Sequence, residues 1–396
     1  MQNKELFTGL KVVELASVLA GPSVGQFFAE LGAEVIKIEN LHAGGDVTRT
    51  WKGNGEQTGD VSAYFSSVNW GKKSLALDLS KKEGQEIVRQ LATKADLIIA
   101  SYKPGDAEKL GVDYHTLSKL NRGLIYGQVT GYGADSDRVG YDAVIQAESG
   151  FMDLNGTPES GPTKMPVALI DVLAAHHLKE GLLLALLRRF QTKEGELVEV
   201  SLIQAALSSL ANQGTNWLVA NILPTRKGSE HPNIAPYGEN FETADKKRVL
   251  LAVGSDRQFQ NLCKILNISD LGFDPRFKTN SDRVKNRKPL AEALSNAIAE
   301  KTSSEFMLEC SQFKIPAGII QNVRDALSMK EAEAVILKGQ ISGLRQMIST
   351  HDGLLPEATH ILPPPHFGQH TTQILSENFG FTAEKLDFLR NSGLIN

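Results

Sequence analysis

The chain has few cysteines and no long apolar segment, and both absences limit what it can be. Its 396 residues include only Cys263 and Cys310. Two cysteines form neither a disulfide framework nor a four-cysteine zinc site, and they suit a reducing compartment. No apolar run approaches the roughly 18 residues that cross a bilayer. Charges at Glu5, Lys11 and Glu14 interrupt any signal-peptide core. We therefore expect a cytoplasmic protein that does not enter a membrane.

The chain also lacks a large excess of positive or negative residues. The chain has 42 lysines and arginines and 46 aspartates and glutamates, so its formal net charge is -4. No basic field is available to attract nucleic acid. With 41% hydrophobic and 22% charged residues the composition is that of a globular protein. The length of the chain predicts about two domains.

The short motifs of common catalytic and metal sites are absent. The sequence contains no G-x-S-x-G, G-x-x-x-x-G-K-[ST], H-E-x-x-H or C-x-x-C. His176 and His177 are adjacent in a predicted helix, where successive side chains point about 100° apart and cannot share a metal ion. We expect no metal site, so the chemistry has to come from other residues.

The most informative stretch lies near the start of the chain. Residues 10–39 read LKVVELASVLAGPSVGQFFAELGAEVIKIE. Apolar and amphipathic patterns predict a strand, a helix and a second strand, at 12–15, 23–31 and 35–38. Gly21 is expected as the N-cap of the helix and Pro22 as its first residue. Together these elements form a right-handed βαβ unit of a parallel sheet.

A dinucleotide-binding domain also begins this way, with an acidic residue such as Glu39 on the ribose. The turn sequence LAGPSVG does not match G-x-G-x-x-G, and Pro22 removes an N–H group that would face a pyrophosphate. Both observations favour another ligand. An NAD-binding or non-catalytic α/β protein stays open as an alternative.

The alternation of strands and helices continues through the first half of the chain and defines the fold class. Further strands are predicted at 73–79, 95–102 and 124–133, and helices at 81–94 and 108–120. Such alternation predicts an α/β fold with a doubly wound parallel sheet of Rossmann type. Ligands bind these sheets beyond the carboxyl ends of the strands.

Composition shifts divide the rest of the chain. Long helices are predicted over 171–190 and 383–391, and a stretch rich in Pro, Gly, His and Asn at 223–240 marks a linker or a functional loop. The expected organisation is a large ligand-binding domain with its first part at 1–205, a linker and active-site loop at 206–240, a small domain at 241–318, and a return segment at 319–396 that packs on the large domain.

Asp171 follows an apolar run and opens the first of these long helices, which allows two interpretations. As an N-cap it would accept hydrogen bonds from the first turn. In a dry cleft the positive end of the helix dipole would keep the same carboxylate ionised. It could then attack an activated acyl group as a nucleophile.

Many ordered segments of the chain resemble the class III CoA-transferases, the CaiB/BaiF family that includes formyl-CoA transferase. The matching segments are VVELASVLAGP, ELGAEVIKIE, GGDVTR, NWGKKSLALDLSKKEG, ADLIIASYKPG, LGVDY, LIYGQVTGYG, GYDAVIQAESGFMDLNG, GELVEVSL, HPNIAPY and PAGIIQNV. The resemblance implies a homodimer of two interlocked ring-shaped chains. It also implies acyl-CoA and carboxylic acid substrates, and no permanently bound cofactor, since the coenzyme A thioester is itself a substrate.

By this resemblance Asp171, in VALIDV, is the catalytic nucleophile. The implied route forms a mixed anhydride with Asp171, releases CoA thiolate, and returns the thiolate to give an aspartyl-CoA thioester. The acceptor carboxylate then repeats these steps in reverse. The predicted function is CoA transfer from an acyl-CoA to a free carboxylic acid, with succinyl-CoA as one expected partner.

The resemblance also implies a set of CoA-binding positions. They are Val18, Ala20, Leu77, Ser101, Tyr102, Lys103 and Lys109. Three differences from the family pattern matter: the family's N-F-R-P-G is S-Y-K-P-G here, Leu19 replaces a glutamine, and Asn40 replaces an arginine. These differences argue against oxalate as the acceptor, and they point to Lys37 or Arg49 as cations for the CoA phosphates.

The related α-methylacyl-CoA racemases are the main alternative within the family. They use a histidine in a G-H-D-like motif, where this chain has Gly140-Tyr141-Asp142. A tyrosine with a pKa of about 10 is a poor base at neutral pH, so we expect no racemase activity. Tyr141 and Asp142 are instead predicted to line the acyl site and bind substrate through hydrogen bonds.

The loop at 228–237 occupies the place of the family's glycine-rich active-site loop. His231 and Asn233 are predicted to donate hydrogen bonds to the distal carboxylate of a dicarboxylate such as succinate. A domain linker with surface charges is the alternative interpretation of the same residues.

Overall fold

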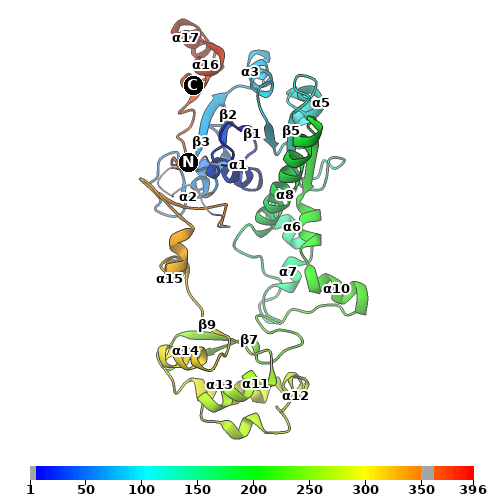
Figure 1. The fold of residues 1–396 in the computed structure, drawn as a ribbon, viewed down its shortest axis with the longest axis vertical. Helices are drawn as coiled ribbons and strands as arrows, with labels where there is room; N and C mark the ends of the chain where they lie inside the picture. Colours follow the sequence, from blue (N-terminus) through cyan, green and yellow to red (C-terminus); the bar gives the residue numbers. More distant parts are fainter. Residues whose placement is uncertain (1–5, 349–360) are drawn as a thin grey trace. The chain divides into compact units, whose positions relative to one another are not determined.

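The computed structural model describes residues 6–348 and 361–396, and the chain divides into two compact units (Figure 1). Unit 1 and unit 2 are made of separated segments: Met1–Ser149, Met165–Ala220 and Glu333–Asn396 in unit 1, and Gly150–Lys164 and Asn221–Ala332 in unit 2. The chain therefore passes from one unit to the other after residues 149, 164, 220 and 332. The four-part organisation expected from composition stays a prediction.

Unit 1 is built on a six-stranded sheet in which all strands are parallel. The strand order is β3-β2-β1-β4-β5-β6, which confirms the predicted doubly wound α/β class. The strands are β1 (Lys11–Leu15), β2 (Glu34–Asn40), β3 (Lys72–Leu77), β4 (Leu97–Ala100), β5 (Ile125–Thr130) and β6 (Leu197–Ser201). The order reverses between β1 and β4, and ligands bind at such a reversal.

Helices lie on both faces of the sheet because successive side chains of a strand point to opposite faces. On β4, Ile98 packs into the cluster that contains α3 (Lys82–Ala92), while Ile99 lies beside α1 (Ala20–Glu30). The other helices of unit 1 are α2 (Ala63–Ser66), α4 (Asp106–Lys109), α5 (Tyr114–Leu117), α6 (Asp142–Glu148), α8 (Leu169–Thr192), α9 (Leu202–Ser208), α10 (Ala211–Ala220), α16 (Thr371–Phe379) and α17 (Ala383–Asn391). The long helix α8 packs beside α1.

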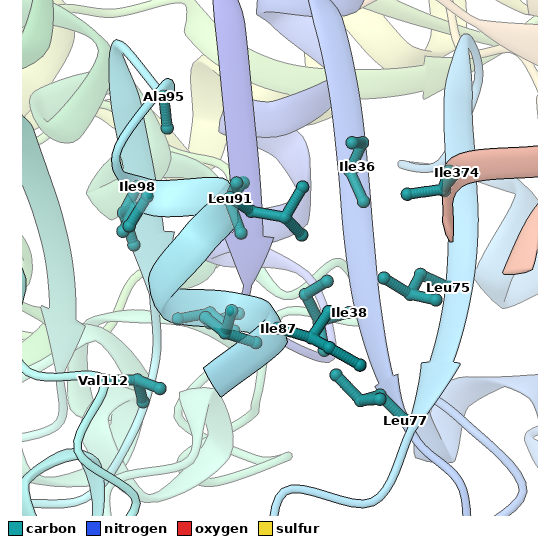
Figure 2. Packing of buried hydrophobic residues seen from close by; sticks show 14 of the residues in the cluster. Ile36, Ile38, Leu75, Leu77, Ile87, Leu91, Ala95, Ile98, Val112 and Ile374 are labelled. Carbon is teal, nitrogen blue, oxygen red and sulfur yellow. The ribbon is translucent and has the colours of Figure 1, made fainter. Parts of the chain in front are cut away.

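The main core of unit 1 lies between α3 and the sheet. Figure 2 shows Ile87 and Leu91 of α3 directed toward the sheet, with Ile87 close to Ile38 of β2. Ile374 of α16 lies beside Leu75 of β3 in the same cluster. Burying one such side chain contributes about 1.5–3 kcal/mol, so the cluster fixes α3 and α16 on the same face.

The end of the chain packs against the edge strand β3. Leu77 forms an antiparallel bridge with Ile395, and the Asp78 N–H group donates to the Leu394 carbonyl at 2.9 Å. The helix predicted over 383–391 is confirmed as α17. Since an edge strand presents unpaired backbone groups, the last residues cover part of that edge.

Two predicted helices differ from the observed ones. The first helix begins at Ala20 with Leu19 as N-cap, so Gly21 and Pro22 are its second and third residues. Pro22 is tolerated there because first-turn N–H groups have no intrahelical acceptor. The helix predicted over 108–120 is instead two short ones, α4 and α5, because Gly111 adopts a left-handed φ of 62° and ends the first.

Unit 2 contains a three-stranded antiparallel sheet in the order β7-β8-β9. Its strands and helices are β7 (Tyr237–Glu242), β8 (Arg248–Ala252), β9 (Ala317–Ile319), α7 (Phe151–Leu154), α11 (Asp256–Ile265), α12 (Asn280–Lys285), α13 (Arg287–Ile298), α14 (Ser303–Gln312) and α15 (Val323–Leu327). Both cysteines are buried in its core as free thiols. Unit 1 also has a two-stranded antiparallel sheet, β10 (Ile336–Lys338) with β11 (Ser342–Leu344).

Two kinds of feature are not found in the part of the chain that the structure describes. No helix there is long and apolar enough to cross a membrane. No group of three or more histidine, cysteine, aspartate or glutamate side chains there could hold a metal ion.

Candidate active site

A cleft of about 270 Å³ opens at the carboxyl ends of β1, β4 and β5, where the strand order reverses. Eight of the twelve predicted site residues line it. They are Val18, Ala20, Ser101, Tyr102, Lys103, Tyr141, Asp142 and Asp171. The cleft therefore brings together the predicted nucleophile, the predicted acyl-site residues and most of the predicted CoA-binding residues.

Asp171 is the third residue of α8 and is buried, with 8% of its surface exposed. It is not the N-cap: Ala168 holds that position, and no side chain caps the helix from there. Within the described residues, no hydrogen-bond donor contacts the Asp171 carboxylate. Burial and the nearby Asp142 raise the pKa of Asp171 to about 7. Desolvation and a like charge therefore oppose the helix dipole that was expected to keep this group ionised.

Asp142, the first residue of α6, supplies the cap that Asp171 does not. Its Oδ1 atom accepts from the backbone N–H groups of Ile170 at 2.7 Å and Asp171 at 3.3 Å. Its Oδ2 atom accepts from Nε2 of Gln146 at 2.6 Å. Asp142 lines the cleft, yet both of its oxygen atoms are engaged by groups of the protein.

The turn between β1 and α1 is held in an unusual conformation. Val18 has a left-handed φ of 74°, which is rare for a β-branched residue. Its N–H group donates to both carboxylate oxygens of Asp46, at 3.2 and 3.3 Å, and the Ser17 N–H group donates to Oγ of Ser101 at 3.1 Å. Asp46 and Ser101 thus stabilise a turn that costs energy, as is typical of functional sites.

The start of α1 faces the same cleft. Leu19, Ala20 and Gly21 line it, and Leu19 makes no side-chain cap. No acidic residue lies in the first turn of this helix. The first N–H groups of a helix have no intrahelical acceptor, and the positive end of the dipole lies with them. The turn therefore offers donors to an oxygen that carries negative charge.

A second cleft of about 400 Å³ lies over the ends of β1, β2 and β3 and includes Leu77. Tyr102 lines both clefts, so the two adjoin at this ring. Burial raises the pKa of Tyr102 to about 12, which keeps its hydroxyl neutral. Lys109 lines neither cleft: it is exposed on α4, and its Nζ atom lies 2.8 Å from Oδ1 of Asp106.

The cations expected to hold the CoA phosphates are not available for that purpose. Lys37 is buried between Glu14 at 2.9 Å and Asp46 at 3.0 Å. Arg49 is also buried and donates to both carboxylate oxygens of Glu39, at 2.8 and 2.6 Å. The assignment of Lys37 or Arg49 to phosphate is therefore wrong, because the ammonium group of Lys37 and the guanidinium group of Arg49 already neutralise buried carboxylates.

Sequence reasoning missed Arg138, which lines the cleft together with Lys103. The Arg138 guanidinium lies 3.8 Å from the centre of the Tyr132 ring, and its Nη2 atom lies 2.6 Å from Oε1 of Glu148. Arg138 stands in no recognisable motif. Its position near the sequence GYD was the one signal that could have drawn attention to it.

His231 and Asn233 lie in unit 2, in a loop that is anchored within that unit. Nδ1 of His231 accepts from the Asn233 N–H group at 3.1 Å, and the His231 ring packs edge-on against Tyr237. Arg287 donates to the carbonyls of His231 at 2.6 Å and Ile234 at 2.9 Å. The loop is thus fixed by α13, and its predicted contact with substrate remains a prediction.

Comparison with known proteins identifies the family to which this fold belongs. A sequence model of CoA-transferase family III matches residues 7–371, so the chain belongs to this family. It is 35% identical over 393 residues to the succinate–glutarate CoA-transferase of Agrobacterium fabrum, covering 94% of this chain and 96% of that protein. It is 31% identical over 406 residues to the human succinyl-CoA:glutarate CoA-transferase, covering 100% of this chain and 91% of the human protein.

A solved structure gives the same result. The crystal structure of a CaiB/BaiF family protein from Brucella suis has a TM-score of 0.84 and 36% sequence identity, and the match covers 95% of this chain and 100% of that one. The chain is therefore an enzyme that transfers CoA, as the sequence predicted. The alternative of a non-catalytic or NAD-binding protein is wrong.

Proposed function

We propose that the enzyme moves CoA between succinyl-CoA and a second carboxylic acid by covalent catalysis through Asp171. The observation that carries the proposal is the Asp171 carboxylate itself, which is buried in the cleft without a hydrogen-bond donor or a cation among the described residues. Burying a carboxylate in this way is costly, and such groups cluster at functional sites.

In the first half of the reaction, Asp171 takes the acyl group from CoA and then exchanges it for CoA itself. An oxygen of ionised Asp171 attacks the thioester carbonyl, the C–S bond breaks, and CoA thiolate leaves with the bonding electrons. The product is a mixed anhydride between Asp171 and the acyl group. The thiolate then attacks the Asp171 carbonyl carbon, and the acyl group leaves as a free carboxylate. The acceptor acid reverses these steps on the aspartyl-CoA thioester, so no proton or water is consumed.

Each addition step places negative charge on a carbonyl oxygen. The N–H groups of Leu19, Ala20 and Gly21 at the start of α1 support the proposal, because they present donors to the same cleft. Donors that are oriented before reaction stabilise such an oxyanion without reorganisation. The strained turn at Val18 and its anchor Asp46 keep these donors in place.

The two adjoining clefts suggest how CoA is held. The pantetheine arm would pass Tyr102, where the clefts meet, with the nucleotide part beyond it along Leu77. Lys103 and Arg138 are the cations that line the reactive cleft. They are therefore proposed to attract the phosphates or the substrate carboxylate.

The dicarboxylate part of the proposal rests on the named activities of the relatives and on the unit 2 loop. Succinate or succinyl-CoA appears in the names of the Agrobacterium and human proteins. His231 and Asn233 would donate hydrogen bonds to the distal carboxylate of such a substrate. His231→Ala and Asn233→Ala should raise KM for a dicarboxylate more than for a monocarboxylate of similar length.

The proposed covalent route is tested by trapping. Purified enzyme is incubated with succinyl-CoA and then with hydroxylamine, and its peptides are analysed by mass spectrometry. Hydroxylamine should convert the aspartyl thioester or anhydride to a hydroxamate on the peptide that contains Asp171. A hydroxamate on another residue would contradict the proposal, as would transfer by an Asp171→Ala variant at more than about a tenth of the normal rate.

A racemase reaction is not part of the proposal. Tyr141 stands where a catalytic histidine would be needed, and it is 59% exposed at the edge of the cleft. A phenol is in general a poor catalytic base at neutral pH. Deuterium uptake at the α-carbon of a 2-methylacyl-CoA, at a rate equal to transfer, would reverse this conclusion.

We also propose the interlocked homodimer that the family resemblance implies. Large apolar side chains are exposed on α8 and α10, and exposed apolar patches mark interfaces. Examples are Leu187, Phe190, Leu218 and Val219. Mass photometry at nanomolar concentration should show only dimers. A folded and active monomer would contradict the proposal.

A further inference from the structure

We propose that Asp142 is a positioning residue that fixes the first turn of α8 and holds a negative charge beside Asp171, so that it sets how readily the nucleophile is ionised. This inference rests on the proposed function of Asp171 as the nucleophile. It gives Asp142 a role different from the substrate contact that its sequence motif suggested.

The Asp142 carboxylate is hydrogen-bonded to groups of the protein itself. Its two oxygen atoms accept from three donors: the N–H groups of Ile170 and Asp171 and the Gln146 amide. Asp142 is 9% exposed, and among the described residues no cation pairs with it. The Asp142 carboxylate beside Asp171 is therefore held by hydrogen bonds, without a counter-ion among the described residues.

Gln146 fixes the orientation of this arrangement. Its Oε1 atom accepts from the Met165 N–H group at 2.9 Å, so its Nε2 atom is the one directed at Asp142. The two contacts join α6 to the segment that leads into α8. Gln146 thus holds the capping carboxylate against the turn that carries the nucleophile.

The cap also removes the effect that would otherwise favour an ionised Asp171. The positive end of a helix dipole resides in the N–H groups of the first turn, and Asp142 occupies two of them. Asp171 therefore lies at a helix end whose first N–H groups are already hydrogen-bonded, and next to one negative charge. Burial and Asp142 together raise the pKa of Asp171 to about 7, which agrees with this geometry.

The other groups near Asp171 are accounted for. Lys103, Arg138 and Tyr141 line the same cleft, whereas the residues that α1, β5 and α9 contribute to it are uncharged. Tyr64 of α2 lies near enough for Asp171 and Asp142 to raise the pKa of its hydroxyl, after burial itself. Among the charged groups of the described residues, Asp142 is the one that raises the pKa of Asp171.

The chemical consequence is a nucleophile more basic than its substrates. Free acyl acids resemble the Asp and Glu side chains, with pKa values of about 4. A more basic carboxylate is a better nucleophile toward the thioester, but a larger fraction of it is protonated at neutral pH. The charge of Asp142 therefore increases the reactivity of ionised Asp171 while shifting its working range to higher pH.

The test removes the charge and keeps the cap. Asp142→Asn retains an oxygen acceptor for the Ile170 N–H group, and Asp142→Ser is a second uncharged variant with a shorter side chain. In both variants the acidic limb of kcat/KM for succinyl-CoA should move down by about one pH unit. Glu180→Gln, which removes an exposed carboxylate from the same helix, is the control and should leave the limb unchanged.

A readout that needs no turnover separates this inference from the proposed function. Carbodiimides modify protonated carboxyl groups, so labelling of Asp171 against pH, measured by peptide mass spectrometry, reports its ionisation directly. The midpoint should fall by the same amount in Asp142→Asn and Asp142→Ser. If labelling shifts but no acid accepts CoA, the proposed function fails and the Asp142 role stands. If CoA transfer is normal and neither midpoint nor limb moves, the Asp142 role fails alone.

Discussion

Two groups of buried charges belong to the same parallel sheet and its connections, and they are built in opposite ways. Below the β1–α1 turn, Glu14 is paired with Lys37 and Lys72, and Glu39 is paired with Arg49. In the cleft, Asp171 has no cation partner among the described residues, and the charge of Asp142 raises its pKa. The paired charges hold the strands and the turn around the site in place. Asp171 has no such partner, so its carboxylate is free to react with substrate.

The pKa values follow the same contrast. Burial acts to raise the pKa of Asp46, but Lys37 and the hydrogen bonds of Thr48 hold it below its usual range. For Asp171, burial and Asp142 both raise the pKa, and no hydrogen bond from the described residues lowers it. Desolvation is similar in the two places, so the partner decides the direction. The following experiments test this comparison.

Removing the unpaired carboxylate should have the largest effect. Asp171→Ala should lower the rate of CoA transfer by several orders of magnitude, because a covalent nucleophile has no substitute. CoA binding, measured by calorimetry, should persist because the proposed CoA contacts are made by other residues of the two clefts. Loss of both binding and activity would instead identify Asp171 as a structural residue.

Breaking the paired group should affect stability more than chemistry. Lys37→Met leaves Glu14 and Asp46 without their shared cation and should lower the free energy of unfolding by about 3–5 kcal/mol. Urea denaturation measures this change. Lys103→Met, at an exposed lysine in the same unit, is the control and should change stability by less than about 0.5 kcal/mol. Equal effects of the two variants would contradict the comparison.

Neutralising Asp171 should stabilise the protein in a pH-dependent manner. The folded-state pKa is raised to about 7, so the charged form is disfavoured by folding and stability is lost as the pH rises from about 4 through 7. Asp171→Asn avoids this loss and should be more stable than wild type by up to about 4 kcal/mol at pH 8, with almost no difference near pH 4. A difference that is constant with pH would show that charge is not the cause.

Relaxing the strained turn should give a smaller gain. Val18→Gly removes the penalty of a β-branched residue at φ 74°, and should add about 1 kcal/mol of stability after the entropic cost of glycine. KM for acyl-CoA should rise because the turn that lines the cleft is less fixed. Val24→Gly, at a buried helical position in α1, should instead destabilise, and a loss of stability in both variants would mean that Val18 is not strained.

The smallest effect is expected at Lys109. Since Lys109 lines neither cleft and is paired with Asp106, Lys109→Ala should change KM for acyl-CoA less than twofold. Lys103→Ala, at a lysine in the cleft, should change it more. A tenfold rise for Lys109→Ala would show that Lys109 leaves Asp106 and reaches the cofactor when CoA binds.

The fold was predictable because its signals are local. The apolar runs at β1, β2 and β4 and the periodicity of α17 specify those elements within a few residues. Boundaries failed where a single residue outweighed the pattern, as at Gly111, or where the helix began before an expected cap, as at Leu19. Neither effect is visible in periodicity alone.

Most residues of the site were predictable from the sequence, but the contacts between them were not. Asp171 stood out by its place after an apolar run and by the family resemblance. Its cap, Asp142, lies 29 residues earlier in the chain, and the anchor of Val18, Asp46, lies 28 residues later. Such partners are decided by the packing of helices and turns, which sequence spacing does not encode. Lys37 and Arg49 were misassigned for the same reason, because their carboxylate partners come from other elements.

The division of unit 1 into separated segments has a consequence for how the enzyme is made. Ribosomes deliver the chain from its N-terminus, so the sheet and the whole cleft emerge before the larger segment of unit 2, and α16 and α17 emerge last. Until then the surface around Leu75 lacks Ile374 and the other side chains that cover it (Figure 2). The nascent enzyme thus carries an assembled catalytic cleft beside an uncovered apolar surface. Slower synthesis or added chaperone should therefore raise the yield of correctly folded protein more than any change in the cleft.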